Sequence, residues 1–300
     1  MMRRAQAIAM CLFAGAGIAF GQQGATATIR DGNVTTSGGV WIHYLEAGDA
    51  ASARTLVLIP GWRLPAFLWE EQLKNFGRTN RVIAIDPRSQ GESEKTSVGN
   101  TPETRAKDLH DVLGKLGVER MVLVGWSQGA QDVAAYLGEF GTDAIEGVVF
   151  VDSPVSAGPN EIEIRRDFSK AIITNISIYA NHPEEFSKGM VKGLFRQPHP
   201  DAYIAKIVNS TMQTPVDAGI SMLVMDIFGA DRRPALIKLK KPALVISSAA
   251  SPLLDAQKEM AASIPGAKWM TIEGAGHAVF VDQPEKFNEA LRGFLKGLAK

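Results

Sequence analysis

The sequence has almost no cysteine and no excess of either charge. Cys11 is the only cysteine in 300 residues, and it lies in an apolar stretch near the N-terminus, residues 5–20. A chain cleaved after that stretch could form neither disulfides nor thiolate metal sites. Basic and acidic residues balance at 32 each, so no basic surface is expected. Nucleic acid and anionic membranes are therefore not expected partners.

The N-terminal stretch predicts export. Arg3 and Arg4 precede the apolar residues 5–20, which are too few and too rich in alanine and glycine for a convincing membrane span. Small residues at Ala19 and Gly21 favour signal-peptidase cleavage after Gly21. We therefore expect residues 1–21 to be a signal peptide and the mature protein to be secreted or periplasmic, free of the membrane. An uncleaved anchor is the alternative.

Short apolar runs alternate with helical patterns along most of the mature chain, which predicts an α/β fold with a mostly parallel sheet covered on both faces. Strand-like segments at 25–29 and 40–44 come first, with turns at 31–32 and 38–39. Buried strands are predicted at 55–59, 81–85, 121–124, 147–151 and 243–247, and a final strand is predicted at 268–272. The alternation breaks between them, because residues 154–234 contain helical patterns and no good strand. We expect a core of residues 22–153 and 235–300, and a helical lid of residues 154–234.

The stretch Gly125-Trp126-Ser127-Gln128-Gly129 lies between a predicted strand and a predicted helix. Glycines two residues before and after a serine permit a sharp strand-to-helix turn, where a side chain would collide with neighbouring backbone. The serine hydroxyl is then exposed at a helix N-terminus, where an oxyanion is favoured. The pattern predicts a nucleophile elbow at Ser127.

A serine hydroxyl needs a base, and His277 is the histidine best placed to be that base. It lies on the loop after the last predicted strand, at the sheet edge where the carboxyl ends of parallel strands meet. The remaining histidines are interpreted as surface or core-filling residues: His43, His110, His182 and His199.

These motifs together resemble the α/β-hydrolase superfamily over the whole mature chain. Pro60-Gly61-Trp62 matches its oxyanion loop, and the stretch that begins at Asp86 matches its D-x-R-x-x-G-x-S turn. The elbow at Ser127 and the Gly276-His277 segment complete the set in the right order. Small cofactor-free esterases and peroxidase-like perhydrolases are the more similar members.

The resemblance implies a mechanism that the residue types also support. Ser127 attacks an acyl carbon with His277 as base, and the backbone N–H groups of Trp62 and Gln128 stabilise the oxyanion. No cofactor is required, and the sequence has no metal-ligand spacing. A serine at the elbow argues against the dehalogenase and epoxide-hydrolase branches, which use aspartate there.

The usual acid of this family is missing. It would follow the penultimate strand just before a proline, and Ser251 occupies that place. A serine cannot hold an imidazolium as a carboxylate does. We predict Asp152, which directly ends the strand at 147–151, as the acid, with Asp255 as the second choice. An aspartate that only caps the entry to the lid is the competing interpretation of Asp152.

Aromatic residues near the predicted site suggest an apolar pocket. Trp126 and Phe280 are predicted to contact substrate. Arg63 follows Trp62 and could meet a substrate carboxylate, although a solvated arginine is the favoured interpretation.

The leading hypothesis is a secreted serine hydrolase acting on a small ester or lactone. A perhydrolase or a carbon–carbon bond hydrolase on the same triad is the alternative enzyme. A non-catalytic ligand-binding protein of the same fold is the third hypothesis, and the missing acid at Ser251 is its only support. Nothing in the sequence specifies an oligomeric state.

Overall fold

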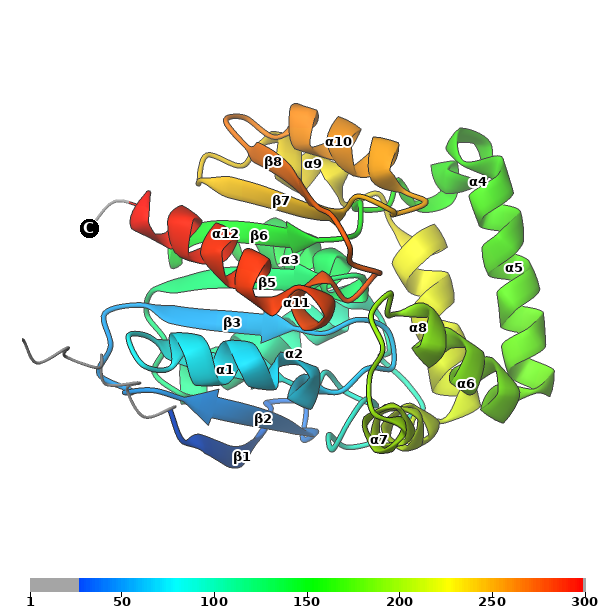
Figure 1. The fold of residues 1–300 in the computed structure, drawn as a ribbon, viewed down its shortest axis with the longest axis horizontal. Helices are drawn as coiled ribbons and strands as arrows, with labels where there is room; N and C mark the ends of the chain where they lie inside the picture. Colours follow the sequence, from blue (N-terminus) through cyan, green and yellow to red (C-terminus); the bar gives the residue numbers. More distant parts are fainter. Residues whose placement is uncertain (1–26, 299–300) are drawn as a thin grey trace, which may run out of the picture.

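The computed structural model describes residues 27–298, and the predicted signal peptide lies outside them (Figure 1). These residues form an eight-stranded sheet in the order β1-β2-β4-β3-β5-β6-β7-β8. Only β1–β2 and β2–β4 pair antiparallel, so the predicted mostly parallel sheet is confirmed. The strands are β1 Ile29–Thr35, β2 Trp41–Ala47, β3 Thr55–Ile59, β4 Arg81–Ile85, β5 Met121–Trp126, β6 Ile145–Val151, β7 Ala243–Ser248 and β8 Lys268–Ile272.

Helices cover both faces of the sheet, as the alternation predicted. Figure 1 shows α1 (Glu70–Phe76) and α12 (Pro284–Lys296) in front of the strands, and α2 (Pro102–Lys115) and α3 (Gln128–Phe140) behind them. The second face also carries α9 (Arg233–Ile237) and α10 (Leu254–Ser263). Each face has its own apolar core. Because both faces are covered, every residue of β3, β4, β5 and β7 is buried.

The first strand differs from the prediction. A turn was expected at residues 31–32, but β1 runs straight through both of them and pairs with β2. Gly32 lies opposite Tyr44, and a Cβ on Gly32 would come within 2.6 Å of the tyrosine ring. The glycine therefore makes room for a cross-strand aromatic side chain, which is a strand role rather than a turn role.

The segment predicted to be a helical lid forms helices gathered at one end of the sheet (Figure 1). It comprises α4 Glu161–Ile164, α5 Arg166–Asn181, α6 Pro183–Gly193, α7 Asp201–Met212, α8 Val216–Val224 and the π-helix Met225–Gly229. This helical segment contacts the loops at the carboxyl ends of the strands. Trp62 Nε1 donates to Gly219 O at 2.8 Å, and Ala278 N donates to Leu194 O at 2.9 Å.

None of the helices within residues 27–298 is both long and apolar enough to cross a membrane.

Asp282 does not cap the last helix, although a capping role fits its spacing to Glu285. The chain forms a short helix, α11 (Val279–Asp282), before α12, and the residue at the α12 cap position is Gln283, whose side chain makes no capping hydrogen bond. The Asp282 carboxylate instead accepts hydrogen bonds at 2.7 Å from the backbone N–H groups of Gly276 and Arg196. Asp282 thus ties the loop that carries His277 to the helical segment.

Candidate active site

Ser127 lies on the sharp turn between β5 and α3 with a strained backbone, φ 55° and ψ −117°. Left-handed φ values are rare for residues with a side chain and often mark functional sites. Glycine is needed on both sides of Ser127 for the predicted steric reason, since a side chain would collide with neighbouring backbone. A Cβ on Gly125 would lie 2.4 Å from Gly129 O, and one on Gly129 would lie 2.6 Å from Ile59 O.

The loop after β3 packs directly against Ser127. A Cβ on Gly61 would lie 3.1 Å from Ser127 Cβ and 3.5 Å from its Oγ, so a side chain there would crowd Ser127. Among the described residues, neither the Trp62 N–H nor the Gln128 N–H donates a hydrogen bond to another loop or to a side chain. Gln128 also begins a helix of 13 residues, whose N-terminus favours negative charge. The two predicted oxyanion donors therefore remain available near Ser127.

His277 and Asp152 are brought together from segments 125 residues apart. His277 Nδ1 lies 2.7 Å from Asp152 Oδ2, and the Asp152 side chain is only 1% exposed, whereas that of His277 is 32% exposed. A carboxylate at Nδ1 favours the tautomer in which Nδ1 carries the proton and Nε2 is free to accept one. The pair thus has the arrangement that a serine base requires.

Asp152 is held by its other carboxylate oxygen. Oδ1 accepts a hydrogen bond from Ser248 N at 2.9 Å and another from Gln257 Nε2 at 3.1 Å. The backbone of Asp152 has a left-handed φ of 46°. Asp255, the second choice, is exposed in the first turn of α10, so the structure pairs His277 with Asp152 instead.

Gln257 is a site residue that the sequence interpretation missed. It is fully buried, and its Nε2 bridges Asp152 and the Oγ of Ser251, the residue in the usual acid position. Its Oε1 accepts from Ser247 Oγ at 2.7 Å. One signal was present, because Gln257 is the polar member of the otherwise apolar buried face of α10. Although residue 251 has no carboxylate, the carboxylate of Asp152 lies beside His277.

The predicted pocket residues Trp126 and Phe280 are buried, although Phe280 borders a cavity of about 510 Å³ that Phe67 and Tyr203 also line. Both are 0% exposed, because they pack against Trp69 in the apolar core behind His277. The only polar side-chain atom of Trp126, Nε1, donates to His277 O at 3.0 Å. Trp126 thus supports the loop of His277 through this hydrogen bond.

Arg63 is not solvated, contrary to the favoured interpretation. Its side chain is 0% exposed and lies beneath the helical segment. Nη2 donates to Ser187 Oγ at 2.8 Å and to Thr211 O at 3.0 Å.

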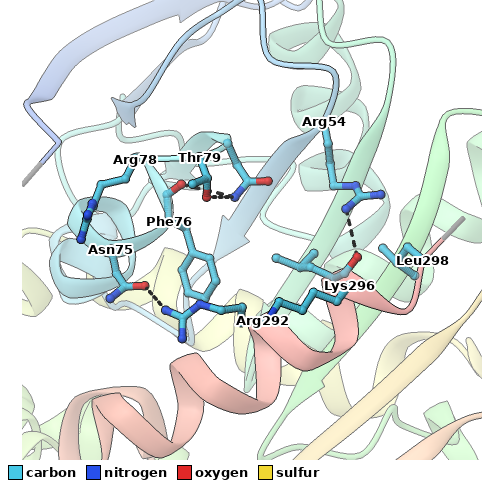
Figure 2. A pocket seen from close by; sticks show the side chains of 10 residues that line it. Arg54, Asn75, Phe76, Arg78, Thr79, Arg292, Lys296 and Leu298 are labelled. Carbon is cyan, nitrogen blue, oxygen red and sulfur yellow. Dashed lines mark hydrogen bonds between the residues drawn. The ribbon is translucent and has the colours of Figure 1, made fainter. Parts of the chain in front are cut away.

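Two cavities differ in their position relative to the candidate active site. One, of about 420 Å³, borders Asp152 and His277 as well as Ser251. Another, of about 590 Å³, lies between α1 and the end of α12 and is shown in Figure 2. Its basic side chains include Arg54 and Arg292, which bond to Leu295 O and Asn75. Because Arg54 directly precedes β3, this second cavity lies at the opposite ends of the strands from Ser127.

The described part of the chain contains no group of three or more histidine, cysteine, aspartate or glutamate residues arranged to hold a metal ion.

Comparisons with known proteins identify the family of the chain. The model of the Alpha/beta hydrolase family matches residues 56–290. The chain is similar to the non-heme chloroperoxidase CPO-A1 of Kitasatospora aureofaciens, with 28% identity over 87% of this chain and 98% of the relative. It is also similar to the bifunctional esterase/perhydrolase DCH of Acinetobacter calcoaceticus, with 24% identity over 88% and 99% of the two chains.

A solved structure is similar over the same span. The crystal structure of a bromoperoxidase from Bacillus anthracis superposes with a TM-score of 0.78 and 28% identity, covering 88% of this chain and all of the other.

Proposed function

Because the chain belongs to the α/β-hydrolase family, we propose that it is a serine hydrolase that cleaves a small ester or lactone through an acyl-enzyme on Ser127. The observation that carries this proposal is the contact between His277 Nδ1 and the buried Asp152, which leaves Nε2 as the nitrogen for the Ser127 proton. The similarity to an esterase/perhydrolase supports the proposed hydrolase chemistry.

The steps follow from the positions of these groups. The Ser127 Oγ attacks the acyl carbon while His277 Nε2 takes its proton, and Asp152 stabilises the imidazolium. The oxyanion accepts hydrogen bonds from the N–H groups of Trp62 and Gln128. His277 then returns the proton to the leaving alcohol, and water attacks the acyl-enzyme with His277 again as base. The products are a carboxylic acid and the free serine.

Hydrogen peroxide in place of that water would release a peracid, which makes perhydrolysis the second candidate. The names of the relatives favour it, since one is called an esterase/perhydrolase and others a chloroperoxidase and a bromoperoxidase. The same acyl-enzyme serves both reactions, so the nucleophile that attacks it decides the product.

We further propose that the helical segment is a lid that sets the substrate range, and that the protein is exported and cleaved near Gly21. The lid proposal is supported by the contacts of the helical segment with the Trp62 and His277 loops. Intact-mass measurement of the exported protein tests the cleavage, and a mass that still includes Cys11 would refute it.

A panel of p-nitrophenyl esters of rising acyl length, assayed with and without hydrogen peroxide, tests the reaction. We expect the wild-type protein to hydrolyse short acyl esters, and the folded Ser127→Ala protein to be inactive on all of them. Hydrolysis that persists unchanged in Ser127→Ala would show that the nucleophile lies elsewhere. Peracid formation at rates that exceed hydrolysis would favour the second candidate.

A further inference from the structure

Arg63 occupies a position that is unfavourable for an arginine in two respects. It is the third residue of the Gly61–Leu64 turn, closed by a hydrogen bond from Leu64 N to Gly61 O at 3.1 Å, and its φ is 60°. Glycine or asparagine usually fills such a position, and strain of this kind costs about 1–3 kcal/mol. Its guanidinium is also fully buried. A position that served only to close the turn would favour a small neutral residue.

The other buried arginines of residues 27–298 all face a carboxylate. Arg81 bonds to Glu46 at 2.6 Å, Arg88 to Asp108 at 2.6 Å, and Arg105 to Asp132 at 2.8 Å. Arg232 bonds to Glu103 at 2.8 Å. Arg63 forms no ion pair with any described residue, and burial lowers its pKa to about 10. Buried charges are normally paired, so Arg63 is the exception that needs an explanation.

Hydrogen-bond donors remain open around this guanidinium. Nε and Nη1 of Arg63 are buried without a partner among the described residues, and so is the hydroxyl of Tyr179. The guanidinium carbon lies 4.1 Å from the centre of the Tyr179 ring and 5.0 Å from that of Trp62. Stacking against two rings holds the guanidinium while leaving its in-plane N–H groups to a ligand.

This cluster adjoins the candidate active site. Arg63 directly follows Trp62, a predicted oxyanion donor, and lies two residues from Gly61, which packs on Ser127. The helical segment contacts the Arg63 guanidinium directly, through Tyr179 of α5, Ser187 of α6 and Thr211 of α7. A ligand on Arg63 would therefore be enclosed between the oxyanion loop and the proposed lid.

We infer that Arg63, together with the Tyr179 hydroxyl, binds a carboxylate carried by the substrate, so that the enzyme prefers esters or lactones bearing a second, anionic group. This inference rests on the proposed function and names its substrate class. One unpaired guanidinium balances a single negative charge, which favours a carboxylate over a doubly charged phosphate monoester. Binding in an enclosed site makes such a charge-assisted hydrogen bond strong.

Matched ester pairs test the inference. The p-nitrophenyl monoesters of succinate and glutarate are compared with p-nitrophenyl butanoate and pentanoate, which lack only the terminal acid. We expect a higher kcat/KM for the acidic member in the wild-type protein. Arg63→Met should reduce that preference by about tenfold to a hundredfold, chiefly through KM, and Arg63→Lys should retain part of it. Arg78→Met, which removes an exposed arginine, should change neither ester.

The opposite results would overturn the inference. A wild-type protein with a higher kcat/KM for the neutral esters would overturn it, and this result does not depend on whether Arg63→Met folds. An equal loss on both members of a pair in Arg63→Met would assign Arg63 to structure alone. Tyr179→Phe supplies a milder variant, in which we expect a selective rise in KM for the acidic ester.

A binding measurement separates this inference from the proposed hydrolysis. Calorimetric titration of Ser127→Ala with glutarate should show binding that Ser127→Ala/Arg63→Met lacks, whether or not the wild-type protein cleaves esters. Hydrolysis without glutarate binding or acidic preference would overturn the inference and leave the hydrolase proposal standing. Glutarate binding without hydrolysis would overturn the hydrolase proposal and leave the carboxylate-binding inference standing.

Discussion

Two of the histidine–aspartate pairs within residues 27–298 have the same separation and different surroundings. His277 Nδ1 lies 2.7 Å from Asp152, and His43 Nδ1 lies 2.7 Å from Asp86. In the second pair, Nε2 of His43 also contacts a carboxylate, Asp31 Oδ2, at 3.1 Å. The His43 side chain is only 9% exposed. His277 is 32% exposed, and its Nε2 has no partner among the described residues.

The difference shows what a histidine–aspartate pair needs in order to act as a base. A carboxylate on each ring nitrogen favours the protonated form of a histidine and leaves neither nitrogen free to take a proton from a serine. Burial alone lowers the pKa of His43, but hydrogen bonds and charges from Asp86 and Asp31 outweigh it and raise the pKa above 6.5. His43 therefore joins β2 to the loop after β4, whereas His277 keeps Nε2 free for the base role that we propose for it.

Asp152→Asn should have the largest effect. Oδ1 of residue 152 faces the donors Ser248 N and Gln257 Nε2, so the new amide nitrogen would face His277. It would donate to Nδ1 and force the proton onto Nε2, the wrong tautomer for a base. We expect kcat for ester hydrolysis to fall by about 10³- to 10⁴-fold with the fold intact. Asp255→Asn is the control, and a collapse in that variant while Asp152→Asn stays active would reverse the assignment.

Gln257→Leu should have the next largest effect. It removes the side-chain donor that holds Asp152 and leaves the contact between Asp152 and His277 without that support. We expect kcat to fall by about tenfold, because a hydrogen bond to a charged group contributes roughly 1.5–3 kcal/mol. Ser251→Ala, which loses only the bond from Gln257 to Ser251, should remain within a few-fold of wild type. Equal losses in the two variants would argue against a specific role for Gln257.

Phe186→Ala should change substrate preference more than rate. The Phe186 ring lies 6.1 Å from that of Trp62, so it links α6 to the oxyanion loop. If the helical segment is a lid, a smaller residue there should shift the preferred acyl length while the shortest ester is cleaved within a few-fold of wild type. An acyl-length profile identical to wild type would count against a lid at this point.

His43→Asn should leave ester hydrolysis almost unchanged and alter stability instead. The raised pKa of His43 means that protonation in the folded state adds stability, fully present below pH 6.5. That contribution disappears as the pH rises through the folded-state pKa. The stability difference between wild type and His43→Asn, measured by urea unfolding, should therefore be largest at acid pH and shrink toward pH 8. A difference independent of pH would show that His43 is not protonated in the fold.

The sequence predicted correctly those features that depend on neighbouring residues, such as strand boundaries and the turn at Ser127. Residues 55–59 and 81–85 form strands at the predicted boundaries, because buried parallel strands are short, mostly apolar runs between turn residues. Residues 268–272 also form a strand at the predicted boundaries, although this edge strand is largely unburied. The elbow at Ser127 lies between a strand and a helix, as predicted. A Cβ on either flanking glycine would collide with neighbouring backbone, which is the steric reason that the sequence pattern indicated.

Features set by distant contacts were not predictable. The turn expected at residues 31–32 was predicted from Gly32, and the neighbouring sequence does not indicate that the Tyr44 ring lies opposite this glycine. The burial of Arg63 depends on helices more than 100 residues further along the chain. Gln257 acquires its role only because β6 and α10 converge on Asp152. Local pattern thus predicts elements, while pairing between remote elements decides which polar side chains are buried together.

The most direct test of the central claim is mapping the adduct of a fluorophosphonate probe by peptide mass spectrometry. The account predicts a single modified peptide containing Ser127 in wild type and in His43→Asn, with labelling much slower in Asp152→Asn and absent in Ser127→Ala. An adduct on another residue, or labelling in Asp152→Asn as fast as in wild type, would contradict the assignment of Ser127, His277 and Asp152 as the catalytic triad.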